Sequence, residues 1–310
     1  MSQYCMEGTL NYNSGTISTG SFTGIEIVNI CRDLGAVNRK AIHQTTSKGV
    51  PLVYHCRVTV YRTPDTSDAD GLTEVKAITV PQNWVFRNAA VKLHAARNKM
   101  FKKNGVTKSM LGRYASTIRY GMTGTDMTLF LPPLDAAGAL IWDESGSETW
   151  DLSQIAISTD TDLKVLLCGA SHPDEEASVS ASSFNLATAY LNSRKPVAFD
   201  DQTDADTPAA YSIIRDMFMN YQAATDDEVL TIAEITQDHP PYDADDVDGP
   251  FTQCVEQGRC HTGQGTASIS SMNVDVPFGL LQLKAQRHNF GTTGNFDFRI
   301  DVLGVSEMQG

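Results

Sequence analysis

The chain has 310 residues, with 24 lysines and arginines against 37 aspartates and glutamates, so its formal net charge is −13. With 41% hydrophobic and 20% charged residues it has the composition of a globular protein, long enough for one large domain or two of about 150 residues. The acidic balance argues against a protein that wraps nucleic acid over its whole surface. No stretch reaches the roughly 18 apolar residues of a membrane span, and no secretory signal opens the chain, so we expect synthesis in a reducing cytoplasm.

Short β-strands are the predominant prediction along the chain. Apolar residues alternate with Thr, Ser and Asp, and Gly, Pro and Asn separate the alternating segments. Strands and helices do not alternate regularly, which argues against a parallel α/β sheet. The predicted strands are, in chain order, 16–28, 52–62, 73–80, 116–122, 127–131, 139–142, 152–158, 163–169, 229–235, 267–274, 279–284 and 296–302.

Two longer helices interrupt the predicted strands. The first spans 84–104, because Asn83 can cap its N-terminus, apolar residues repeat along one face and Gly105 follows its end. The second spans 207–223 and begins with a Thr-Pro pair, which suits the first helical positions. Shorter helices are predicted at 107–115 and 183–191.

The two halves of the chain share an order of elements: opening strands, a helical segment, then closing strands. A polar run around Gly146 separates them. The predicted fold is therefore mainly β, with two tandem jelly rolls (a double jelly roll) and helical insertions in each. The predicted domains are residues 1–146, with the basic helix 84–104, and residues 147–310, with the helix 207–223.

Positive charge is concentrated in one segment. Between Asn83 and Thr125 there are nine basic residues and no acidic one, which leaves 15 basic against 37 acidic residues, a net charge of −22, for the rest. Basic side chains on a helix often only keep its polar face hydrated, but such one-sided charge is easier to maintain opposite a negative surface. We expect an assembly surface or a lipid-facing surface made of Arg87, Lys92, Arg97, Lys99, Lys102, Lys103, Lys108, Arg113 and Arg119.

No catalytic motif is recognisable. The chain lacks a nucleophile elbow, an HExxH helix motif, a phosphate-binding loop and a dinucleotide fingerprint. The seven histidines are scattered, and no pair of carboxylates is singled out among 37 acidic residues, so a glycosidase that uses two carboxylates stays only an alternative. We therefore expect no catalytic residue, no resident cofactor and no enzyme activity.

The sequence contains two kinds of candidate metal site. Cys254, Cys260 and His261, with His239 as a fourth ligand, could bind zinc, although reduced thiols in a loop or a disulfide fit this spacing as well. Calcium could bind oxygen ligands in acidic loops, but neither loop has the pattern of an EF-hand and hydrated turns explain both. The acidic residues are Asp65, Asp68 and Asp70 in the first loop and Asp243, Asp245, Asp246 and Asp248 in the second.

Several stretches resemble a known family. Residues 84–100 (WVFRNAAVKLHAARNKM), Gly105 with Val106, and 114–120 (YASTIRY) resemble the helix-and-strand region of major capsid proteins of small tailless bacterial viruses. Two stretches of the second half are similar in the same way, 148–153 (ETWDLS) and 276–281 (VPFGLL). The likeness is to the double jelly roll lineage, which includes the lipid-containing phage of Flavobacterium, and it rests on packing residues rather than on catalytic ones.

The resemblance implies a viral structural protein of the virion, made in the host cytoplasm, that self-assembles as pseudo-hexagonal homotrimers into an icosahedral shell. The implied partners are copies of the chain, minor capsid and vertex proteins, and the lipids of an internal membrane. Direct genome binding is not expected, because no long basic arm opens the chain. The alternative from another class is a two-domain β-sandwich that binds carbohydrate or a receptor through exposed tryptophans and calcium loops.

Overall fold

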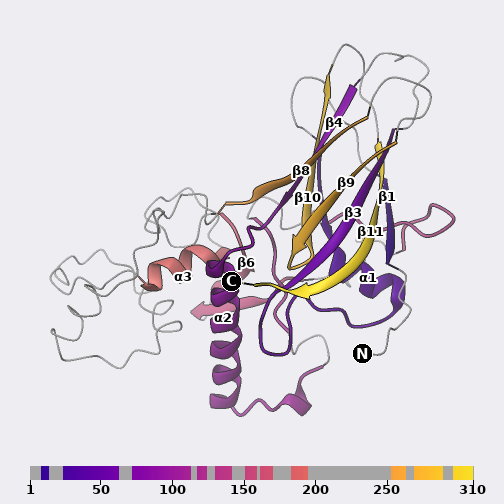
Figure 1. The fold of residues 1–310 in the computed structure, drawn as a ribbon. Coiled ribbons are helices and arrows are strands. Elements are labelled where there is room, and N and C mark those ends of the chain that lie inside the picture. Colours follow the sequence, from indigo (N-terminus) through magenta and orange to yellow (C-terminus); the bar gives the residue numbers. More distant parts are fainter. Residues whose placement is uncertain are drawn as a thin grey trace.

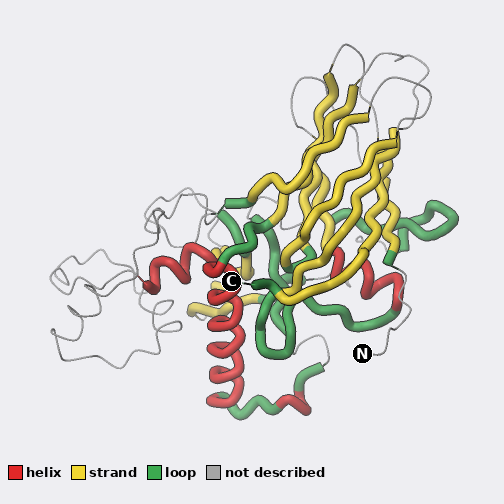
Figure 2. The backbone as a smooth tube through the Cα atoms, viewed as in Figure 1, coloured by secondary structure: helices red, strands yellow, loops and turns green. Residues whose placement is uncertain are grey.

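A computed structural model of the chain describes the following residues: 8–13, 24–62, 72–112, 117–123, 130–141, 151–158, 161–169, 183–194, 253–262, 269–288 and 296–309. Within them, eight strands form two four-stranded antiparallel sheets that face each other (Figures 1 and 2). The first sheet has the order β1-β11-β3-β9 and the second the order β2-β10-β4-β8. Their bounds are β1 Thr9–Asn13, β2 Gly24–Asn29, β3 Leu52–Arg62, β4 Leu72–Thr79, β8 Val255–Thr262, β9 Ile269–Pro277, β10 Leu280–His288 and β11 Phe296–Glu307.

The connectivity of these eight strands is that of a jelly roll. The first strand pairs with the last, the second with the second-last, and so on inward: β1 with β11, β2 with β10, β3 with β9 and β4 with β8, each antiparallel. The chain thus follows one long hairpin, which is wound so that β11 also pairs with β3 and β10 with β4. Two sheets built in this way define the double-sheet jelly roll. The prediction of a mainly β protein is confirmed.

The predicted division at residue 146 differs from what the described strands show. Strands β1 to β4 precede this point and β8 to β11 follow it, yet each sheet contains two strands from either side. The described strands therefore form one jelly roll from both halves, rather than one jelly roll in each half. Apolar alternation indicates which face of a strand is buried but carries no information about its partner, so it could not reveal that the last strands pair with the first.

A long insertion joins β4 to β8 at the tip of this hairpin. Its described residues form a three-stranded sheet, in which β5 and β6 are antiparallel and β6 and β7 parallel, with two helices packed beside it. Trp84 and Tyr190 join the helices in an edge-to-face contact, 6.2 Å between ring centroids. The bounds are α2 Trp84–Lys103, the 3-10 helix η1 Lys108–Met110, β5 Gln154–Ser158, β6 Thr161–Leu166, β7 Ser183–Asn185 and α3 Leu186–Arg194.

Two apolar clusters stabilise this architecture. One lies between the two large sheets, where Tyr12 stacks on Phe298 at 4.9 Å. The other joins the base of the sandwich, through residues such as Val53 and Phe278, to the buried faces of α2, β6 and α3. The insertion is therefore packed on the jelly roll through a shared core, and burial of apolar area stabilises both together.

The insertion also covers a free edge of each large sheet. The N–H of Leu131 donates to the carbonyl of Ile27 in β2, and that of Leu134 donates to the carbonyl of Asn11 in β1, both at 2.8 Å. β1 and β2 are the outermost strands on this side of the sandwich. Pairing them with chain from the insertion satisfies backbone groups that would otherwise offer an open edge to other molecules.

Several predicted elements differ from the structure. In the described part of the strand predicted at 116–122, residues 117–122, one isolated bridge joins Gly121 to β6. The described residues of the strands predicted at 127–131 and 139–142, which are 130–131 and 139–141, take part in isolated bridges. Of the helix predicted at 107–115, the described residues 107–112 contain η1, and residues 113–115 lie outside the described residues. The helix predicted at 183–191 is β7 followed by α3. Residue 146, the helix 207–223 and the strand 229–235 lie outside the described residues. None of the described helices is long and apolar enough to cross a membrane.

Candidate assembly surface and pocket at helix α2

Helix α2 is buried at its start and exposed at its end. The side chain of Asn83 caps it by accepting a hydrogen bond from the Phe86 N–H at 3.1 Å, as predicted. Phe86, Ala90 and Leu93 are among the residues that pack into the shared core, whereas most residues beyond Ala95 are exposed. After Lys103 the chain leaves the helix through Gly105, which has a φ of +71°. The predicted helix is confirmed, and its second half projects below the sandwich (Figure 2).

The basic residues expected to form one surface point in different directions. Arg87 donates from Nε to the carbonyl of Met308 at 3.1 Å, and the Nζ of Lys92 lies 5.0 Å from the ring centroid of Tyr190. Arg119 donates from Nη1 to the carbonyl of Asp151 at 3.1 Å. These three cations therefore make contacts within the chain, although Lys92 is also exposed.

The remaining cations are grouped at the free end of the helix. Lys99, Lys102 and Lys103 are exposed there together with Met100, and Met110 is exposed in η1, the next element of the chain. We call these five residues the α2 tip. The sequence has no acidic residue between Asn83 and Thr125, so the positive potential of the tip is not cancelled along its own segment. Lys108 belongs to η1, its side chain is not described, and Arg113 lies outside the described residues.

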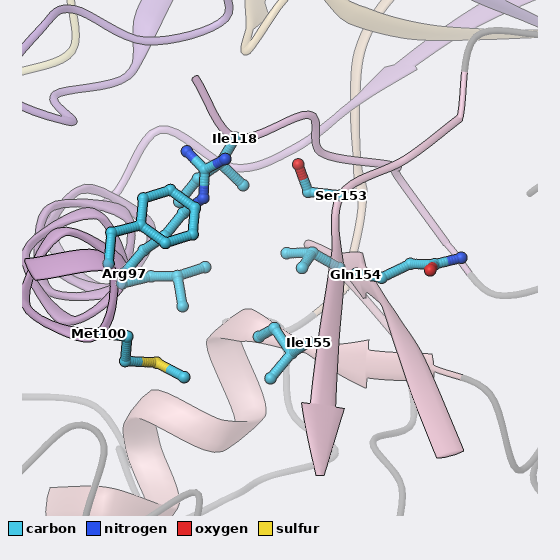
Figure 3. Close-up of a pocket in the computed structure, with 9 residues that line it drawn as sticks. Arg97, Met100, Ile118, Ser153, Gln154 and Ile155 are labelled. Carbon is cyan, nitrogen blue, oxygen red and sulfur yellow. The ribbon is translucent and has the colours of Figure 1, made fainter. Parts of the chain in front are cut away.

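A pocket of about 230 Å³ lies between the helix and the small sheet (Figure 3). Met100, Ile118 and Ile155 point into it, while the side chain of Gln154 is directed away. The lining residues are Leu93, Arg97, Met100, Phe101, Ile118, Ser153, Gln154, Ile155 and Val165. Most of the wall is therefore apolar, which suits an apolar side chain or a small apolar ligand.

Arg97 forms part of the pocket wall instead of the outer charged surface. Its Cζ lies 4.6 Å from the ring centroid of Phe101, a cation–π contact. Burial lowers the pKa of Arg97, and the nearby charge of Arg119 lowers it further. The guanidinium of Arg97 is thus held against the protein.

The proposed zinc ligands are not brought together. Cys260 is buried between the two large sheets, and the next residue, His261, is exposed on the opposite face of β8. Cys254 instead lies beside Cys168, which accounts for part of the raised pKa of the Cys168 thiol after burial, the main cause. Both thiols are free. His239 and both acidic loops lie outside the described residues, and within the described part of the chain no three ligand-type side chains form a metal site.

Two polar clusters were missed by reasoning from the sequence. Arg32 and Asp33 form a buried ion pair at the start of helix α1 (Ile30–Asn38), 2.6 Å from Nε to Oδ1. His55, Asp275 and Ser306 form hydrogen bonds on the outer face of the first sheet, although 220 and 251 residues separate His55 from the other two. No local pattern signals such a cluster, because only the pairing of β3 with β9 and β11 brings these residues together.

Comparison with protein-family models, with curated proteins and with solved structures found no match for this chain.

Proposed function

We propose that this chain is a viral coat protein that assembles with copies of itself into an icosahedral shell. The observation that carries the proposal is the jelly-roll pairing of the eight described strands, a fold used by viral capsid and lectin domains and by cupins. The resemblance of residues 84–100 to capsid proteins favours the first of these uses. As a coat protein, the chain would be made in the host cytoplasm and found in the virion.

The charge distribution supports contacts between copies. The α2 tip is positive and projects from the body of the subunit, whereas the chain outside 83–125 carries a net charge of −22. A protruding cationic element on one copy and an acidic surface on another attract each other, and closed rings of identical subunits use such contacts repeatedly. The exposed methionines of the tip add apolar area that a neighbouring copy would bury.

The expectation of a pseudo-hexagonal trimer needs revision. A pseudo-hexagonal trimer needs two similar β domains in each chain, and the described strands supply one jelly roll. We therefore propose self-association with one jelly roll per subunit and the β4–β8 insertion as the element that projects from it. Homotrimers, minor capsid and vertex proteins, and membrane lipids belong to the proposal as partners of the assembled shell.

A sugar-binding function has less support in the described residues. Lectin sites present exposed aromatic rings on which a sugar can stack, but Trp84 packs against Tyr190 inside the insertion. Trp142 and Trp150, and the acidic loops considered for calcium, lie outside the described residues. The coat-protein proposal therefore accounts for more of the described structure.

Charge reversal at the α2 tip tests the proposal. The Lys102→Glu/Lys103→Glu double variant is compared with Lys40→Glu/Arg57→Glu, which alters the net charge equally at exposed positions away from α2. Native mass measurement and electron microscopy should show particles for the wild type and for the control, and folded subunits without particles for the tip variant. Arg97 is left unchanged because a glutamate there would place a carboxylate in the pocket wall.

Two outcomes would contradict different parts of the proposal. A normal particle yield from the tip variant would remove the tip from the assembly contacts. A wild-type chain that stays monomeric over a range of salt and protein concentrations would overturn the coat-protein function itself. High salt should weaken assembly of the wild type, because it screens contacts between exposed charges.

A further inference from the structure

Three neighbouring strands of the first sheet bring an acid, a histidine and a serine together on its outer face. Asp275 is on β9, His55 on β3 and Ser306 on β11. The Nδ1 of His55 lies 2.6 Å from Oδ1 of Asp275, and its Nε2 lies 2.9 Å from Oγ of Ser306. Each contact is within hydrogen-bond distance, and the histidine lies between the other two side chains.

The chemistry of the three groups determines the direction of both hydrogen bonds. An ionised carboxylate can only accept, so Asp275 keeps the imidazole proton on Nδ1. In the neutral ring Nε2 then carries a lone pair and accepts a hydrogen bond from the hydroxyl of Ser306. This is the arrangement in which a histidine can take the proton of a serine that attacks an electrophile.

A β-bulge places Ser306 on this face of the sheet. In β11, Val302 pairs with Cys56 and Gly304 pairs with His55, so one extra residue is inserted between them. Because side chains alternate with a period of two, Ser306 would face the opposite side without the extra residue. Gly304, directly opposite His55, has no side chain to separate the imidazole from Ser306.

We propose that Ser306, His55 and Asp275 form a nucleophilic triad that cleaves esters. Ser306 is the nucleophile, His55 the general base and then the general acid, and Asp275 a positioning residue that maintains the tautomer. The inference goes beyond the coat-protein proposal and does not depend on it. It also revises the expectation that the chain has no catalytic residue.

The reaction balances with water as the only co-reactant. Oγ of Ser306 forms a bond to the acyl carbon while its proton moves to Nε2 of His55. The bond from the acyl carbon to the leaving oxygen then breaks, and His55 returns the proton to that oxygen. Water then attacks the acyl carbon while its proton moves to Nε2 of His55. The bond from the acyl carbon to Oγ of Ser306 breaks, His55 returns the proton to Oγ, and the carboxylic acid leaves.

The site of Ser306, His55 and Asp275 is open to solvent, which favours substrates that react without an enclosed pocket. The side chains of His55 and Asp275 are 43% and 49% exposed, so a substrate reaches them directly from solvent. Aryl esters suit such an open face, because their leaving groups depart readily with little further stabilisation. Suitable probes are therefore p-nitrophenyl acetate for turnover and a fluorophosphonate for covalent labelling.

The experiment uses the full-length protein and compares single variants. Mass spectrometry of tryptic peptides should locate the fluorophosphonate on Ser306, and Ser306→Ala should abolish this label. The turnover of Ser306→Ala serves as the background and is subtracted from the others. The remaining ester turnover of His55→Gln should then be about 100-fold or more below that of the wild type, a typical contribution of a general base. The control is Ser271→Ala, an exposed serine of β9 paired with Thr59 rather than with His55, which should leave labelling and turnover unchanged.

Two variants of Asp275 separate positioning from a purely structural role. In Asp275→Asn the amide can donate to Nδ1 and move the ring proton to Nε2, whereas Asp275→Ala leaves both tautomers accessible. We expect Asn to lower turnover more than Ala, while thermal melting confirms that both variants are folded. Labelling that is spread over many serines, or that is equal in wild type and His55→Gln, would overturn the proposal.

Discussion

The Nε of Arg32 lies 2.6 Å from Oδ1 of Asp33, and the two side chains are only 3% and 0% exposed. The second carboxylate oxygen of Asp33 accepts a hydrogen bond from the hydroxyl of Tyr12 at 2.7 Å. Arg32 also donates from Nη2 to the carbonyl of Leu131 at 2.7 Å, and its Cζ lies 5.2 Å from the ring centroid of Phe130. The pair therefore connects β1, α1 and the insertion inside the fold.

Removal of the Asp33 carboxylate should destabilise the folded protein, because it leaves the buried guanidinium of Arg32 without its counter-ion. We expect Asp33→Ala to lower the free energy of unfolding by about 3–5 kcal/mol, and Tyr12→Phe by about 1.5–3 kcal/mol, since the second variant loses only one hydrogen bond to a charged group. Urea unfolding followed by circular dichroism measures both. Equal losses in the two variants would show that the charge of Asp33 is not what makes this site sensitive.

Two glycines with similar positive φ angles offer a matched test of packing. Gly279, between β9 and β10, has a φ of +66°, and a Cβ there would lie 2.5 Å from Sγ of Cys31. Gly105 has a φ of +71° and open space around it. We expect Gly105→Ala to cost about 1–2 kcal/mol from backbone strain, and Gly279→Ala to cost about 1–3 kcal/mol more from the steric overlap. Similar unfolding midpoints for the two variants would contradict this.

Buried thiols should make the protein sensitive to alkaline pH. Burial raises the pKa of Cys31 and of Cys56 from an ordinary value near 9 to about 12. The unfolded chain therefore loses these protons at a lower pH than the folded protein, so stability is complete below pH 9 and falls as the pH rises toward 12. Urea unfolding between pH 8 and pH 10 should show this decline, and Cys31→Ala should make it shallower. If the free energy of unfolding fell with pH as steeply in Cys31→Ala as in the wild type, the Cys31 thiol would not be a cause of the decline.

Cys168 and Cys254 should form a disulfide on oxidation, whereas Cys254 and Cys260 should not. Cys254 is half-buried beside Cys168, while Cys260 is buried between the large sheets. With diamide as oxidant, mass spectrometry of the folded protein should detect one linked pair of peptides containing Cys168 and Cys254. Cys254→Ala should abolish it. A Cys254–Cys260 link as the main product would contradict the placement of these cysteines.

Local sequence patterns predicted those elements whose signals lie within them. Asn83, the apolar stripe and Gly105 indicated α2 almost to the residue, and alternation indicated β3 and the start of β11. The polar strand β8 was not predicted, because the six residues between Val255 and Thr262, EQGRCH, include none of the β-branched or large aromatic residues that favour strands. Residues 255–262 form a strand because they pair with β4, although their own sequence does not predict one.

The amino-acid sequence by itself determined that this is a mainly β protein with one strongly basic helical segment, because alternation and charge are properties of neighbouring residues. Only the tertiary structure decided that the first and last strands share two sheets, since strand pairing depends on contacts between residues far apart in the chain. The same pairing brings His55 beside Asp275 and Ser306, a cluster that depends on one extra residue in β11. Packing of α2 on the shared core places some of its cations in contacts within the chain and leaves others at an exposed tip.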